Sequence, residues 1–88
     1  MYLHLGGPVS VRERDILGFF DLDNTTTSHL TRKFLERAER EGRLESLTDD
    51  IPKSFILCRA KGESKVYFSQ LSSATLRGRA ESGGSPPE

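Results

Sequence analysis

Two aspartates stand one residue apart directly after an apolar segment that ends at Phe20. They are Asp21 and Asp23, within the run Phe-Phe-Asp-Leu-Asp-Asn-Thr of residues 19–25. A carboxylate at the end of a buried strand can attack phosphorus, a second carboxylate can transfer a proton, and Mg²⁺ can lie between them. The spacing is therefore compatible with phosphoryl-transfer chemistry, provided that the surrounding fold supplies the remaining groups.

This run resembles the first motif of haloacid-dehalogenase-type phosphatases, whose fold is a doubly wound parallel sheet. The strands expected after the motif form a hairpin instead, and the chain of 88 residues leaves no room for the later lysine and acidic pair of that family. Asp49 and Asp50 are expected in a loop, not after a buried strand. An aspartate that ends a strand also has an ordinary use, because it accepts hydrogen bonds from turn N–H groups. We therefore expect no enzymatic activity.

The composition indicates one small domain that needs outside support. A chain of 88 residues with 34% apolar residues buries only a modest core. The single cysteine, Cys58, excludes an internal disulfide and is expected to be a buried strand residue. His4, His29 and Cys58 have no recognisable zinc-ligand spacing, so we expect no metal and no cofactor. By elimination, a partner subunit is the expected support.

No stretch of the sequence approaches the length of about 18 apolar residues that a membrane helix needs. The first five residues carry no basic region followed by an apolar one, so no secretory signal is expected. These features predict a cytoplasmic protein. The formal net charge is zero, yet residues 53–80 contain six basic side chains and one acidic side chain, a local charge of +5. That segment permits an anionic partner.

The pattern of apolar and polar residues predicts three strands before the first helix, over residues 1–5, 9–12 and 16–20. Gly6–Pro8 is expected to join the first two strands as a hairpin. Glu13–Asp15 is expected to be a charged turn before the third strand. The third strand is a continuous apolar run, which is typical of a buried strand.

A second hairpin is predicted by the strand-like residues 54–58 and 65–69 around the turn Lys61–Ser64. Residues 44–50 are expected to be a linker, and a short helix is expected to begin over Ser72–Leu76 with a serine as its cap. On the second strand, Tyr67 and Phe68 alternate, so one is expected to point outward, where it can stack on a base or contact a subunit. The element order predicts an α+β domain with a small, mostly antiparallel sheet.

One central amphipathic helix is predicted between residues 28 and 42. Four apolar residues recur on one face at helical spacing: Leu30, Phe34, Leu35 and Ala38. Ser28 or a neighbouring threonine can cap its start, and Gly42 stands where a left-handed residue ends a helix. The other face has opposite charges four residues apart, which we interpret as a solvated face: Arg32/Glu36, Glu36/Arg40 and Glu39/Arg43. We expect a single domain over residues 1–80 and a disordered tail over residues 81–88.

Five segments, in order along the chain, resemble the RemA/RemB family of bacterial extracellular-matrix (biofilm) regulators. They are Met1–Gly6, Arg14–Asp21, Pro52–Ser54, Val66–Ser69 and Leu71–Leu76. The resemblance extends from Met1 to about Arg79. No segment is specific alone, whereas their joint order and spacing are. The phosphatase-like run falls inside this pattern.

The resemblance implies a small α+β domain related to LytTR-type DNA-binding domains and ring-like homo-oligomers. In the RemA branch it implies DNA binding through arginines repeated around the ring. Carried over by position, the DNA-contacting residues here would be Arg14 and Lys53. The RemA branch also has a pair of arginines just before the strand that Lys53 opens, where this chain has Asp49-Asp50-Ile51.

A ring can make few cations effective, because affinity for DNA rises with the number of phosphates that are neutralised together. We therefore expect a ring-forming, DNA-associated transcriptional regulator that binds the DNA backbone, with no membrane and no small-molecule substrate. Arg14 and Lys53 would contact phosphates, and the weaker candidates are Arg12, Arg59 and Lys61. The alternative, which Asp49-Asp50-Ile51 favours, is an oligomeric regulator that binds proteins and no DNA.

Overall fold

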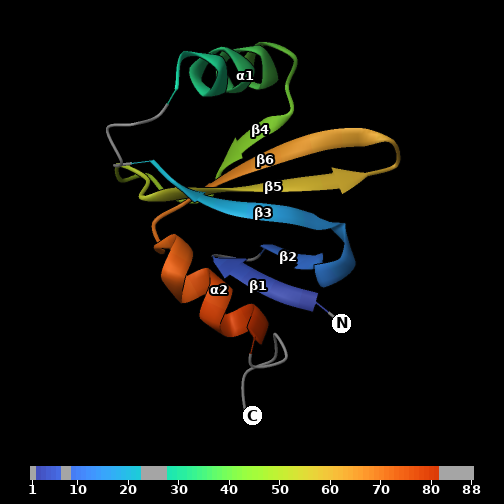
Figure 1. The fold of residues 1–88 in the computed structure, drawn as a ribbon, viewed down its shortest axis with the longest axis vertical. Coiled ribbons are helices and arrows are strands. Elements are labelled where there is room, and N and C mark those ends of the chain that lie inside the picture. Colours follow the sequence, from blue (N-terminus) through green and yellow to red (C-terminus); the bar gives the residue numbers. More distant parts are fainter. Residues whose placement is uncertain (1, 7–8, 23–27, 82–88) are drawn as a thin grey trace.

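The computed structural model describes residues 2–6, 9–22 and 28–81 (Figure 1). The elements follow one another as β1 (Tyr2–Gly6), β2 (Val9–Arg12), the 3-10 turn η1 (Glu13–Asp15), β3 (Ile16–Asp21), α1 (His29–Arg40), β4 (Leu44–Ser46), β5 (Ser54–Ala60), β6 (Glu63–Ser69) and α2 (Ser73–Glu81). The predicted α+β class is confirmed. Of the expected tail, residue 81 is the last of α2 and the remainder lies outside the described residues, as does Asp23.

The strands form two sheets. β1 and β2 make an antiparallel pair, and the second sheet has the order β3-β5-β6-β4. In that sheet β3 and β6 both run antiparallel to β5, which confirms the predicted hairpin of β5 and β6. The turn between them is tight because Lys61 and Gly62 both have positive φ, 54° and 81°, the conformation that two-residue hairpin turns favour.

The predicted linker over residues 44–50 is wrong at its start. Leu44–Ser46 forms β4, which pairs in parallel with residues Val66–Phe68 of β6. Parallel strands need a long connection, and residues 47–62, which include β5, provide it between β4 and β6. α1 lies earlier in the chain, on the connection from β3 to β4 at the opposite edge of the sheet. A strand of three residues carries too short a pattern to be read from the sequence.

The larger sheet is covered on both faces (Figure 1). On one face the β1–β2 hairpin and α2 contribute to a buried cluster with the sheet: Leu3, Leu5, Ile56, Cys58 and Leu76. On the other face α1 contributes to a second cluster: Ala38, Phe55 and Val66. The sheet thus lies between the two helices, and α1 covers one face near β4 and β6, so the expectation of a central helix is replaced by a central sheet.

The side chains of Tyr67 and Phe68 are both partly buried and pack against the core, so the expectation that one of them points outward, to stack on a base or contact a subunit, is wrong. Tyr67 packs against the cluster that contains Ile56, and Phe68 packs against the cluster that contains Phe55. Alternation along β6 still sends them to opposite faces, but both faces are covered.

The ends of both helices agree with the predicted caps. The side chain of Ser28 accepts the backbone N–H of Thr31 at 3.0 Å, and Gly42 has φ +76° just after α1. At α2 the hydroxyl of Ser72 accepts the backbone N–H of Thr75 at 3.1 Å. Within the described segments, neither helix has the length and apolar character that crossing a membrane requires.

Candidate nucleic-acid interface

Four of the five predicted DNA-binding residues gather at one end of the larger sheet. Arg12 ends β2 and Arg14 lies in η1, which contacts β5 and leads into β3. Arg59 stands near the end of β5 and Lys61 in the turn that follows it. All four are exposed. They are collected here because the register pairs Ile16, at the start of β3, with Cys58, near the end of β5.

Lys53, the fifth predicted residue, lies at the opposite end of β5. Its backbone N–H donates to the carbonyl of Ser69 at 2.8 Å, and its carbonyl accepts the N–H of Leu22 at 2.8 Å. The backbone of Lys53 is therefore fixed while its side chain is exposed. With a rise of about 3.4 Å per strand residue, Lys53 and Arg14 are separated by roughly 20 Å within one chain. The structure does not bring these two cations together in a single subunit.

The basic end also carries a cation that was not selected from the sequence. Lys65 of β6 approaches Glu45 of β4 at 3.3 Å, and the hydrogen bond from its ammonium group to Glu45 raises the pKa of Lys65. Lys65 and Arg12 both line a shallow hollow of about 220 Å³, beside Tyr67. Arg12 in turn lies 3.7 Å from Asp15. Because Arg12 and Lys65 are each held in an ion pair, Arg14, Arg59 and Lys61 are the more available cations at this end, although exposed Glu63 begins β6 directly after the turn that carries Lys61.

The surroundings of Lys53 are acidic. Asp49 and Asp50 precede it in the loop between β4 and β5, and both are exposed. This loop is held in place, since the N–H of Asp50 donates to the hydroxyl of Thr48 at 3.0 Å and the amide of Gln70 donates to the carboxylate of Asp50 at 3.4 Å. Two carboxylates close to Lys53 in the sequence, that of Asp50 held by Gln70, weaken the attraction of Lys53 for a phosphate.

A second basic surface lies on α1. Lys33, Arg37 and Arg40 recur at intervals of three and four residues, so they share a face of the helix, and all three are exposed. They border a depression of about 520 Å³ that also includes Leu30, whose side chain is exposed. The spacing of residues 33, 37 and 40 in the sequence already indicates this basic stripe, but we interpreted that side of the helix only as a solvated face.

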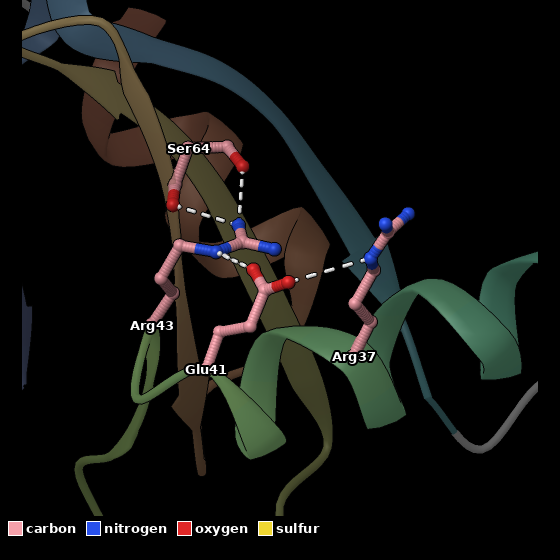
Figure 2. A network of polar contacts seen from close by, with 4 residues as sticks. All are labelled: Arg37, Glu41, Arg43 and Ser64. Carbon is pink, nitrogen blue, oxygen red and sulfur yellow. Dashed lines mark hydrogen bonds and ion pairs between the residues drawn. The ribbon is translucent and has the colours of Figure 1, made fainter.

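Arg43 is a cation whose guanidinium group is held by polar contacts within the chain (Figure 2) and whose side chain is only partly exposed. One of its guanidinium nitrogens, Nη1, donates to the carbonyl of Ser64 at 3.0 Å and to the hydroxyl of Ser64 at 2.5 Å. Its Nε donates to Glu41 at 2.8 Å, and Arg37 approaches the same carboxylate at 3.4 Å. The predicted partner of Arg43, Glu39, is thus replaced by Glu41. Arg43 joins the end of α1 to β6, and two of its three guanidinium nitrogens are thereby occupied within the chain.

Asp21, the first aspartate of the phosphatase-like run, has a structural role. Its carboxylate accepts the backbone N–H of Ser73, the first residue of α2, at 3.1 Å. Hydrogen bonds from the hydroxyl and the backbone of Ser73 lower the pKa of Asp21. The strand that carries Asp21 pairs antiparallel with β5, unlike the parallel strands of the phosphatases. In the described part of the chain, no three His, Cys, Asp or Glu side chains gather to hold a metal ion.

No family model matches the chain. Among curated proteins, it is similar to extracellular matrix regulatory protein B of Bacillus subtilis (strain 168). The two are 33% identical over 81 residues, which cover 92% of this chain and 91% of that protein. The similarity therefore extends over nearly the whole length of both chains.

Proposed function

The chain belongs to the family of extracellular matrix regulatory protein B, and from that premise we propose that it is a bacterial regulator of extracellular-matrix (biofilm) production. It acts in the cytoplasm as a ring-like homo-oligomer that binds the DNA backbone and thereby affects transcription. Its domain, residues 1–80, works in the manner of the LytTR-type DNA-binding domains that the family resemblance implies. It catalyses no reaction and needs no cofactor.

The observation that carries this proposal is the exposed basic end of the sheet. Arg14, Arg59 and Lys61 extend from a 3-10 turn, a strand end and a hairpin turn, all of which are fixed by the β3–β5–β6 ladder. Because the backbone that carries these cations is already fixed, contact with phosphates orders only their side chains, and each phosphate that is neutralised releases counterions. Such contacts fix a protein on the duplex without reading the bases.

Assembly is essential to the proposal because one chain is a poor ligand for DNA. The net charge of the chain is zero, and Asp49 and Asp50 oppose the attraction of Lys53. Several copies on one curved surface would contact the duplex simultaneously, which raises the effective concentration of each basic end. Selectivity among sequences would then depend mainly on how readily the DNA bends.

A second candidate function is an oligomeric regulator that binds proteins and no DNA. The loop between β4 and β5 favours it, because Ile51 is 88% exposed and follows two carboxylates. An apolar side chain in so exposed a position, on a loop held by hydrogen bonds, suits contact with another protein.

A gel-shift or anisotropy experiment on duplex DNA separates the two functions. The wild-type oligomer is expected to bind at about 50 mM salt and to weaken steeply as salt rises. Arg14→Ala should abolish most of this binding, and Lys53→Ala should weaken it. Arg32→Ala is the matched control, since it removes an exposed arginine from α1, away from the basic end. An intact wild-type oligomer that fails to bind DNA at about 50 mM salt would favour the protein-binding function.

A further inference from the structure

The two edge strands of the larger sheet are protected very differently. β4 has only three residues, and its central Glu45 is paired with Lys65. β3 has six residues, and Asp21, its last, carries its only charge. Within the described segments, no strand pairs with the outer edge of β3. Proteins usually shorten an edge strand or place charges on it to prevent pairing with other chains. β3 is neither short nor charged along most of its length, and its one irregularity is the bulge between Ile16 and Gly18.

β3 also exposes apolar side chains. Leu17 is 57% exposed, and the register shift between Ile16 and Gly18 places it as an extra residue against β5. Phe20 is 44% exposed and stacks on Phe55, with the ring centroids 4.9 Å apart. A long edge strand with exposed apolar residues is a template for another strand.

A groove of about 640 Å³ lies next to the edge strand β3, between α1 and α2. Its apolar lining comes from both faces of β3 and from α1, through Phe19, Phe20, Leu30 and Phe34. Arg77 of α2 lines its other side. The helices thus flank the Phe20 end of β3. The groove has room for an apolar side chain that arrives with an incoming strand.

We propose that β3 pairs antiparallel with β3 of a second copy of this chain, about a two-fold axis normal to the sheet near the middle of the strand. A two-fold contact of this kind is self-complementary, so every favourable contact between the two copies occurs twice. Leu17 of each copy would enter the groove of the other, beside Phe20. Asp21, at the end of one strand, would approach Arg14, which stands just before the start of the other. This complementarity of charge and shape favours a second copy over an unrelated strand.

The pairing would also unite cations that one chain keeps apart. Antiparallel alignment places the Lys53 end of one copy beside the Arg14 end of the other. In the order β5-β3-β3-β5, Lys53 and the second copy's Arg14 are about two strand spacings apart, roughly 10 Å, instead of roughly 20 Å. This consequence rests on the DNA-binding function proposed above, whereas the pairing itself does not. A complete ring needs a further contact besides this one.

The test is the particle mass, measured by light scattering on purified full chains. The wild type is expected to contain an even number of 9.8 kDa chains. Leu17→Lys places a charge on the edge of β3 at an exposed position and should lower the mass at least twofold, with an unchanged circular dichroism spectrum. The matched control Ile51→Lys places the same charge on another exposed apolar residue and should leave the mass unchanged. A monomeric wild type, or a Leu17→Lys variant of wild-type mass, would overturn the proposal.

Hydrogen exchange provides a second measurement that needs no variant. The N–H groups on the outer edge of β3 should be protected in the oligomer and should exchange quickly when dilution dissociates it. Rapid exchange at this edge in the intact oligomer would exclude the pairing. DNA binding is measured separately. An oligomer that pairs through β3 but does not bind DNA would contradict only the proposed DNA-binding function. DNA binding by an oligomer with an unprotected β3 edge would remove the pairing alone.

Discussion

Arg14 and Lys53 stand at opposite ends of the ladder between β3 and β5. The register joins Ile16 with Cys58 at one end and Asp21 with Ser54 at the other, so the antiparallel pairing fixes this separation. The sheet therefore sets a requirement on any function that uses both cations together. A single copy presents them on different sides, and an assembly of copies is needed to present them side by side.

Lys61 provides a charge that can be removed without damage to the fold. It occupies the first of two left-handed turn positions, φ 54°, which asparagine adopts more readily than lysine. Lys61→Asn should leave the free energy of unfolding unchanged or raise it by a few tenths of a kcal/mol. The same variant should bind DNA more weakly than the wild type in an anisotropy titration. Loss of stability together with loss of binding would contradict this interpretation of the turn.

Arg43 should contribute more to the free energy of unfolding than Arg37 of α1, which contacts the same carboxylate of Glu41. Its side chain is 18% exposed and donates two hydrogen bonds to Ser64, so Arg43→Ala leaves both acceptors of Ser64 without this donor. We expect a loss of about 2 kcal/mol in urea unfolding. Arg37→Ala removes a cation that is 72% exposed and shares Glu41, and should cost less than about 0.5 kcal/mol. Equal losses in the two variants would refute the role given to Arg43.

Gly18 lets the ring of Phe20 lie across the backbone of β3. A Cβ atom at Gly18 would lie 2.8 Å from the Phe20 ring, so Gly18→Ala must displace the ring from its stacking contact with Phe55. Double-mutant cycles with Phe20→Ala should give a coupling energy of about 1 kcal/mol. Gly78→Ala on α2 is the control, because a Cβ there meets nothing within 4 Å, and it should show no coupling to Phe20.

Cys58 should be inert in the folded protein. Burial, and secondarily the charge of Asp15, raise the pKa of the Cys58 thiol from 9.0 to about 11. An aromatic disulfide reagent should therefore react slowly at pH 8 and rapidly after unfolding in urea. The Cys58 thiol keeps its proton to a higher pH in the folded state than in the unfolded state. This contribution to stability is complete below pH 9 and is lost as pH rises through about 11. The Cys58→Ala variant should not show the loss of unfolding free energy that the thiol causes between pH 9 and about 11. Fast labelling of Cys58 in the native wild type would disprove that the thiol is inert.

Local patterns in the sequence were sufficient for the elements that short-range physics determines. The caps of α1, Ser28 and Gly42, and the hairpin of β5 and β6 were predicted because each depends on neighbouring residues. β4 was missed because its three residues become a strand only through parallel pairing with β6. The partial burial of Tyr67 was missed because the sequence does not state that the β1–β2 hairpin covers that face of the sheet.

The candidate site shows the same difference between features that depend on neighbouring residues and features that depend on contacts far apart in the sequence. The exposed cations were identifiable from their types and from the family resemblance, but their grouping follows from strand register, which the sequence does not show. Lys65 was missed because alternation alone does not reveal that it lies beside Arg12. The stripe of Lys33, Arg37 and Arg40 was visible as spacing, yet nothing local distinguishes a binding face from a solvated one.

The central claim, that many copies each add a few cations to one DNA duplex, is tested most directly by the salt dependence of binding. The slope of log K against log salt changes by about 0.9 for each phosphate contact that is lost. If several copies contact the duplex, Arg14→Ala removes one contact per copy, and we predict that the slope falls by more than about 2. A fall of about 0.9 would show that one chain acts alone, and an unchanged slope would show that Arg14 does not contact DNA; either result would contradict the account.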